Sequence, residues 1–366
     1  MNPLRTLRPL AIGIALVSIT LAGTALAGRN DLKLVNLCPQ TSTNPPGLNV
    51  PDCRWIQRDA NGLIQLQHDA SGRDTGVNID SDGRSNFRSL MSELGVVMAP
   101  RILMPADTLG FAGFSVSGEL GFTQISNNKS YWNGVSAVSP QSPNAARPDA
   151  TLTTVGVFLR KGIWFPAPSF EIGGGVVNLL DSQMLSWQGY AKLALHEGFH
   201  DLPFPSLAVR AAVAYLTGTD QVNLQTTSLD VLVSKGFGAL KTVRIEPFGG
   251  WSLLLIKASG KTIDFTPLCD ARQVAQAAPG QQVSGSCAIS QSGKLNDFLA
   301  NEAFPGQDVI TRYRVFGGAK LRFGVLAVMA QYELYLAGHS RDDNVIPAVD
   351  QSGKQSAFSL STGLEF

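Results

Sequence analysis

The stretch that decides the fold is RYRVFGGAKLRF, residues 312–323. Its apolar side chains share one parity and its basic side chains the other: Tyr313, Val315, Ala319, Leu321 and Phe323 alternate with Arg312, Arg314, Lys320 and Arg322. Alternation with period 2 is the pattern of a β-strand that has one apolar and one polar face. The stretch therefore predicts a strand whose two faces meet different surroundings.

The same alternation recurs along the chain after residue 110. It predicts ten strands, at residues 110–125, 150–162, 168–181, 184–198, 205–218, 223–236, 239–257, 309–324, 325–338 and 355–366. Three of the connections are long, at residues 126–149, 258–308 and 339–354, and all three are odd-numbered. Odd-numbered connections of an up-and-down arrangement emerge at the same end, and the remaining connections are short.

This asymmetry is typical of the transmembrane β-barrels of outer membranes, which have short periplasmic turns and longer external loops. The predicted fold class is all-β: an antiparallel up-and-down transmembrane barrel of about ten strands in residues 110–366. Twelve or fourteen strands are the alternative, if residues 60–109 contribute strands. Loop 258–308 is then the longest external loop.

Composition excludes other classes of protein. Charged residues make up only 16% of the chain and apolar residues 44%, and no apolar run after residue 30 reaches the ~20 residues of a membrane-spanning helix. The formal net charge of +1 argues against a nucleic-acid partner. No motif indicates a cofactor.

The N-terminal residues read as a targeting segment. Arg5 and Arg8 precede an apolar run, and Ala25-Leu26-Ala27 resembles a cleavage site, so residues 1–27 are predicted to be a cleaved signal peptide. Secretion permits disulfides. The four cysteines allow three pairings, of which the local ones are favoured because they close short loops: Cys38 with Cys53, and Cys269 with Cys287.

The last ten residues, AFSLSTGLEF, resemble the C-terminal signal of Gram-negative outer-membrane proteins, an alternating final strand that ends in phenylalanine. Four residues of that signal share the expected lipid-facing parity: Phe358, Leu360, Leu364 and Phe366. The resemblance implies location in the outer membrane, with its lipid and the barrel-assembly machinery as partners.

Residues 28–109 are expected to form a periplasmic extension that either partly plugs the lumen or, as the alternative, only covers the lower rim of the barrel. Phe87, Leu90, Met91 and Leu94 recur at helical spacing and predict a short amphipathic helix that stops at Gly95. The following residues, through the GFAGF stretch at 110–114, resemble the start of an uncharacterised family of outer-membrane barrels. They are loosely similar to the hatch of FadL-type fatty-acid transporters, but lack its Asn-Pro-Ala.

The stretch HEGFH, residues 196–200, matches the H-E-x-x-H pattern of zinc metallopeptidases. That chemistry needs a helix, whereas residues 185–195 keep strand parity. On a strand His196 and His200 would stand about 13 Å apart, too far to bind one zinc ion. A zinc peptidase is therefore a remote alternative, with no metal or catalytic residue assigned, and these residues are expected to form a turn.

Charged residues of the predicted strands oppose the aliphatic parity, so they are expected to line the lumen: Arg210, Arg244, Glu246, Arg312, Arg314, Lys320, Arg322 and Glu333. Charges facing lipid would cost ~2–4 kcal/mol at the membrane midplane. Aromatic residues are expected at the two rims, with Trp164, Phe165, Phe237, Phe323 and Phe366 at one end and Tyr131, Trp132 and Trp187 at the other.

Two functions follow from these patterns. The first is a channel or transporter for small or hydrophobic solutes, with residues 28–109 as a partial plug. The second is a non-transporting surface barrel, such as an adhesin, that binds a partner through loop 258–308. An enzyme is not expected, because no acid–base or nucleophile constellation is present.

Overall fold

The computed structural model describes residues 28–37, 57, 66–68, 74–138, 147–165, 169–197, 204–240, 243–261, 304, 306–344 and 346–366. The predicted signal peptide, all four cysteines with their two expected disulfides, and most of loop 258–308 lie outside these residues.

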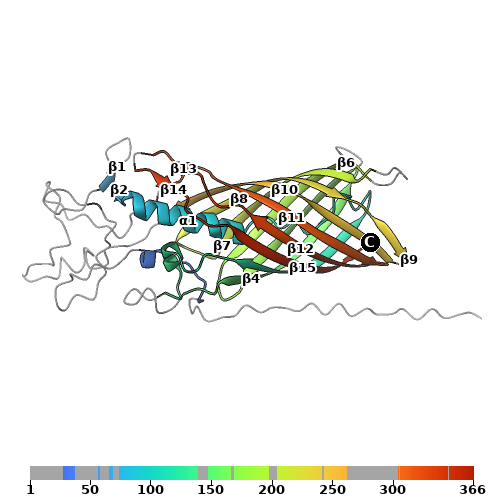
Figure 1. Ribbon diagram of the computed structural model, residues 1–366, viewed down its shortest axis with the longest axis horizontal. Coiled ribbons are helices and arrows are strands. Elements are labelled where there is room, and N and C mark those ends of the chain that lie inside the picture. The colour runs from blue at the N-terminus through green and yellow to red at the C-terminus, as the bar shows by residue number, and fades with distance from the viewer. Residues whose placement is uncertain are drawn as a thin grey trace, which may run out of the picture.

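Ten antiparallel strands form a closed barrel (Figure 1). They are β3 (Phe114–Gln124), β4 (Thr151–Ile163), β5 (Phe170–Leu179), β6 (Leu185–His196), β7 (Ser206–Thr217), β8 (Val222–Ser234), β10 (Val243–Gly260), β11 (Ile310–Phe323), β12 (Leu326–Tyr335) and β15 (Gln355–Glu365). Each pairs with its neighbour in sequence, and β15 pairs with β3 to close the ring. The predicted ten-strand barrel is confirmed.

Two short strand pairs and one further short strand lie outside the ten-strand ring. β1 (Leu66–His68) pairs only with β2 (Asp74–Val77), and β13 (Arg341–Asp342) pairs only with β14 (Ala348–Val349). β9 (Phe237–Leu240) adds to the end of β10. The alternative of twelve or fourteen barrel strands is wrong, because β1 and β2 form a separate sheet instead of joining the ring.

The two faces of the wall, meaning the ten barrel strands, differ as their parity predicts. Along β7 the side chains of Leu207, Val209 and Val213 are exposed outward, while Ala208 and Arg210 are buried inward. Because the outer face is apolar and exposed around the ring, it suits a lipid surrounding. Within the described ranges, no helix has the length and apolar character to cross a membrane.

One helix, α1 (Ser81–Val97), precedes the barrel and lies at the end that carries the long connections, which we call the long-loop end (Figure 1). The opposite end, where the chain finishes, is the short-turn end. The Asp80 carboxylate caps α1 by accepting a hydrogen bond from Gly83 N at 2.7 Å. The predicted helix is confirmed.

The predicted stop at Gly95 is wrong, because α1 continues through Gly95 to Val97. A Cβ atom at Gly95 would lie 2.7 Å from Cγ2 of Ile256 on β10. The glycine therefore allows α1 to approach the wall closely, and it does not end the helix.

The main apolar core lies around α1 at the long-loop end. It joins α1 to two 3₁₀ helices, η1 (Leu34–Leu37) and η2 (Ser130–Gly134), and to the ends of several strands. Phe87 is fully buried, and its ring stacks on Phe304 with centroids 4.3 Å apart. We call this assembly of α1, η1, η2, β13 and β14 the cap.

The rim expectation is wrong for Tyr131 and Trp132, which are buried in the cap. They are buried because both donate hydrogen bonds to the carboxylate of Glu93 on α1, at 2.8 and 2.7 Å. The other aromatic residues expected at the rims are exposed: Trp164, Phe165, Trp187, Phe237, Phe323 and Phe366.

Candidate functional site

The lumen of the barrel contains residues 98–113, which we call the lumen segment. After α1 the chain runs from the long-loop end towards the short-turn end, where β3 begins. Ile102, Met104 and Ala106 are buried and pack against inward side chains of the wall that include Phe248 and Phe316. Pro100 and Pro105 favour an extended chain here, since proline fixes φ and has no N–H to donate.

The wall binds the backbone of the lumen segment at several levels. Carbonyl oxygens accept from buried cations: Arg314 Nη1 donates to Pro100 O at 3.2 Å, Lys192 Nζ to Pro105 O at 3.2 Å, and Arg210 Nη2 to Arg101 O. Backbone N–H groups donate to the wall, from Ala106 to Ser234 Oγ at 3.1 Å. These bonds satisfy the backbone of an extended segment that has no sheet partner.

Buried ion pairs surround the middle of the lumen segment. Arg314 Nη2 lies 3.3 Å from Asp230 Oδ1, and Arg314 Nη1 lies 3.4 Å from Glu333 Oε2. Asp230 also accepts from Arg210 at 2.7 Å, and the Arg210 guanidinium lies 4.6 Å above the ring of Tyr190. All these charged side chains are buried, and each has a partner of opposite charge that offsets the cost of removing it from water.

A second group of charges lies near the short-turn end. Glu171 pairs with Lys192 at 3.4 Å and accepts from Leu109 N at 3.0 Å. Glu365 pairs with Arg160 at 3.0 Å and with Lys320 at 2.7 Å. Glu171 and Lys192 thus hold the lumen segment at this end, and the Glu365 cluster lies beside them.

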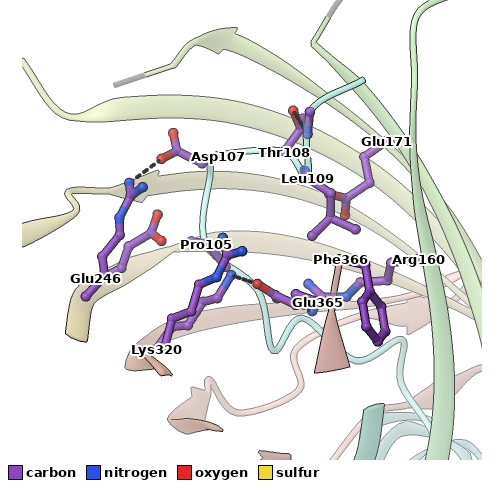
Figure 2. A pocket seen from close by; sticks show the side chains of 13 residues that line it. Pro105, Asp107, Thr108, Leu109, Arg160, Glu171, Glu246, Lys320, Glu365 and Phe366 are labelled. Carbon is purple, nitrogen blue, oxygen red and sulfur yellow. Dashed lines mark hydrogen bonds and ion pairs between the residues drawn. The ribbon is translucent and has the colours of Figure 1, made fainter. Parts of the chain in front are cut away.

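A cavity of about 180 Å³ between the lumen segment and the wall is bordered by four of these charges, Arg160, Glu171, Lys320 and Glu365. Figure 2 shows the contact of Lys320 with Glu365, and Asp107 of the lumen segment in a second marked contact. That second contact is an ion pair of Asp107 with Arg244 at 3.3 Å, and Arg244 is half exposed. The short-turn mouth is therefore polar and open to water.

The long-loop mouth is closed differently, around Glu93 of α1. Besides Tyr131 and Trp132, its carboxylate accepts hydrogen bonds from the backbone of Ser126 at 2.9 Å and Gly353 at 3.3 Å. Burial and the charge of Glu93 raise the pKa of Tyr131 above its ordinary range, since both disfavour the phenolate. One buried carboxylate thus joins α1 to the η2 and β14–β15 connections.

The lumen-lining residues expected from parity all lie on the inward face of their strands. Six of them are buried: Arg210, Glu246, Arg312, Arg314, Lys320 and Glu333. Arg244 and Arg322 are more exposed, at the short-turn mouth. Arg312 binds α1 itself, with Nη1 donating to Ser92 Oγ at 2.9 Å. Four of the six lie where the lumen segment or α1 fills the interior, whereas Glu246 and Lys320 border the cavity at the short-turn mouth.

Several charged residues in and around the lumen segment are not among the lumen-lining residues expected from parity. They are Arg101, Arg160, Glu171, Lys192 and Asp230. Four of them follow the parity rule: Asp230, for example, shares its inward parity with Ser228 and Thr226 on β8. Arg101 lies outside any strand, so no parity could indicate it; its guanidinium donates to Thr154 Oγ1.

The H-E-x-x-H stretch begins on a strand, as expected. His196 is the last residue of β6, and Glu197 follows it. The Glu197 carboxylate accepts from Thr108 N at 2.9 Å and from Ser169 Oγ at 2.8 Å, so it ties the lumen segment to the wall. His200 lies outside the described residues. Among the residues that the structure does describe, no group of three or more His, Cys, Asp or Glu is placed to bind a metal.

The side chains of the C-terminal signal lie on the outer face of β15. Phe358, Leu360, Leu364 and Phe366 are each more than a third exposed. The last residue is paired back onto β3, where Phe366 N donates to Phe114 O at 2.8 Å.

The expected position of the N-terminal extension conflicts with the expected orientation of the loops. Asn30 N donates to Asp181 O at 2.9 Å, in the β5–β6 turn at the long-loop end, and Leu32 bridges to Val135 in a long connection. Residues 28–37 therefore lie with the long loops. They cannot be periplasmic if the long loops are external, because the two share one end of the barrel.

Comparison with protein-family models and with curated protein sequences gave no match. Among solved structures, Ail, the attachment invasion locus protein of Yersinia pestis, is 8% identical, with 70% of this chain and 99% of that chain covered and a TM-score of 0.24. Neisserial surface protein A is 9% identical, with 69% and 95% covered and a TM-score of 0.26. A FadL homologue of Pseudomonas aeruginosa is 11% identical, with 73% and 96% covered and a TM-score of 0.18. Nothing about the function of this chain follows from these values.

Proposed function

We propose that this chain is a non-conducting surface barrel of the outer membrane that presents a folded binding surface at its long-loop end. The observation that carries the proposal is the occupied lumen: residues 98–113 run its length, bound by buried side chains of the wall. A lumen filled in this way has no room for a solute path.

The apolar outer face supports insertion in a membrane, and the segregation of the long loops supports an orientation with the long-loop end outside. Residues 1–27 act as the secretion signal. Outer-membrane lipid and the barrel-assembly machinery are the partners, the latter through Phe358, Leu360, Leu364 and Phe366. Deleting Phe366 should lower the amount of assembled protein, measured by the shift in gel mobility on boiling; an unchanged amount would contradict the insertion role.

The cap supports the binding role. At the long-loop end α1, η1 and η2 share one apolar core, and β13 and β14 pack on α1, so this end presents a defined surface instead of an open mouth. The Ser85 hydroxyl, for example, accepts a hydrogen bond from Val349 N at 3.0 Å and fixes β14 on the helix. Rigid surfaces lose less conformational entropy when they bind.

The channel or transporter that the sequence favours requires the lumen segment to move. A disulfide between Ala106→Cys and Ser234→Cys is designed to hold it, since the hydrogen bond from Ala106 N to Ser234 Oγ at 3.1 Å brings the two residues into contact. Planar-bilayer recordings of the wild-type protein and of the double variant, oxidised and reduced, separate the two functions, with single Ser234→Cys as the control. We expect no steady conductance in any form. Conductance in the wild-type and reduced forms that the disulfide abolishes would replace the surface barrel by a gated channel.

A further inference from the structure

The two described ends of the chain lie at opposite ends of the barrel. Gly28 and Asn30 contact the β5–β6 turn at the long-loop end, whereas Phe366 pairs with Phe114 at the short-turn end (Figure 1). An even number of strands returns a chain to the side on which its barrel begins. The lumen segment adds one further crossing, so the described part of the chain crosses the membrane eleven times and its two described ends are on opposite sides.

A tight turn reverses the chain direction between the lumen segment and the first barrel strand, β3. Gly110 and Ala112 adopt left-handed backbone conformations, with φ of 75° and 66°. Gly113 N donates to Gly110 O at 3.1 Å, which closes a tight turn directly before β3. Gly162 N then donates to Gly113 O at 3.0 Å and joins the turn to β4. The chain thus leaves the lumen at the short-turn mouth and returns as the first strand of the wall.

The interior of the finished barrel is filled on the short-turn side of α1. An α-helix with its side chains is about 10–12 Å wide, and α1 lies immediately upstream of the lumen segment. Below α1 the interior is filled by the lumen segment and by buried side chains such as Phe316, Arg210 and Lys192. This filling favours an order in which the described residues upstream of Met98 reach the long-loop end before the wall closes.

The seam that closes the wall is the pairing of the first barrel strand with the last. β3 and β15 are far apart in sequence, and they pair from Ser115 with Glu365 to Thr123 with Ala357. Two buried residues beside this seam, Glu365 and Arg160, also border the lumen segment. Side chains beside the closing seam therefore also border the cavity next to the lumen segment.

We propose that this barrel exports its own N-terminal segment. Residues upstream of Met98 cross to the long-loop side while the wall is open, and pairing of β3 with β15 then retains them there. The lumen segment is the tether between the exported residues and the membrane. The assignment of the long-loop side as external rests on the proposed function. The placement of the two described ends on opposite sides does not depend on it.

Single cysteine substitutions at four exposed positions test the topology. Arg29→Cys and Asp82→Cys report on the N-terminal segment, Lys129→Cys on a long connection, and Val325→Cys on the shortest turn of the opposite end. Intact cells are treated with a maleimide attached to a polymer too large for porins, and the labelled position is identified by peptide mapping against the wild-type protein. Lysed cells give the maximum labelling.

We expect Arg29→Cys, Asp82→Cys and Lys129→Cys to be labelled in intact cells, and Val325→Cys at least tenfold more after lysis. If Lys129→Cys is labelled in intact cells but Arg29→Cys and Asp82→Cys only after lysis, export is refuted while the orientation of the proposed function stands. If Val325→Cys alone is labelled in intact cells, the orientation is reversed. That result overturns the surface barrel and the export, although the two ends still lie on opposite sides.

The order of events has its own measurement. In a pulse-chase experiment, newly made Arg29→Cys protein is followed both for surface labelling and for the gel mobility of the closed barrel. We expect labelling to appear no later than the closed form, with Lys129→Cys as the reference for loop exposure. Labelling that appears only after closure would show that the segment enters a finished barrel, and would overturn the proposed order.

Discussion

The two mouths of this barrel are closed by different physical means. At the long-loop end, α1 sits in an apolar core in which Phe87 and Leu90 are fully buried, with Glu93 saturated by hydrogen bonds. At the short-turn end, charged side chains hold the lumen segment beside a cavity of about 180 Å³. One mouth depends on the packing of buried apolar side chains, whereas the other depends on charged side chains around a cavity. The two should therefore differ in their sensitivity to substitution, pH and salt.

The largest effect is expected from Phe87→Ala at the long-loop mouth. Removing a fully buried ring that stacks on Phe304 should lower the free energy of unfolding by about 3–5 kcal/mol. Thermal unfolding, followed by the loss of the fast-migrating form on gels, measures it. Phe87→Leu is the matched control and should recover more than half of the loss. A small effect of Phe87→Ala would show that packing does not close this mouth.

A slightly smaller effect is expected from Lys192→Met near the other mouth. The substitution leaves the Glu171 carboxylate buried without its nearest cation and removes two donors to the lumen segment, so we expect a loss of about 3 kcal/mol. The double variant Lys192→Met/Glu171→Gln should be more stable than the single one, because the unpaired charge is gone. Equal stability of the two would argue against electrostatic closure.

Gly95→Ala tests how closely α1 packs against the wall at the long-loop mouth. The added methyl group meets Ile256 at 2.7 Å, and overpacking of this kind costs about 1–3 kcal/mol. Ile256→Val in the same chain should relieve part of the loss. Alanine is otherwise the better helix former, so a stabilised Gly95→Ala variant would mean that the helix does not press on β10.

The stability of the protein at alkaline pH should depend on Tyr131 of the cap. The pKa of Tyr131 is raised by burial and by Glu93, so the folded state holds the phenolic proton at pH values where the unfolded state has lost it. Stability is then unaffected below about pH 10 and falls by up to about 1.4 kcal/mol per pH unit above it. Tyr131→Phe should remove this slope. Identical alkaline unfolding of the two proteins would contradict the role of Tyr131.

The smallest effect is expected from Arg244→Gln at the short-turn mouth. Its ion pair with Asp107 is half exposed, and such pairs contribute less than about 1 kcal/mol and are screened by salt. The difference from the wild-type protein should therefore vanish in concentrated salt. A larger loss that persists in salt would show that this mouth is drier than the structure indicates.

Much of the wall could be predicted from the sequence because strand parity is a local property. The alternation in residues 312–323 is enough to assign one face to lipid and one to the lumen, and the lengths of the connections assign them to the two ends. The spacing of Phe87, Leu90, Met91 and Leu94 likewise predicts α1, since helical periodicity needs only neighbouring residues.

The tertiary structure decided what fills the barrel and on which side the chain begins. The sequence predicts a helix stop at Gly95, but the glycine instead makes room for Ile256, which is distant in sequence. It also predicts Tyr131 and Trp132 at a rim, but both are buried and hydrogen-bonded to Glu93. Lys192 and Arg314 reach the carbonyls of Pro105 and Pro100 across 87 and 214 residues of sequence. Parity fixes only which way a side chain points. What it meets there depends on the closure of the ring, which brings distant residues together.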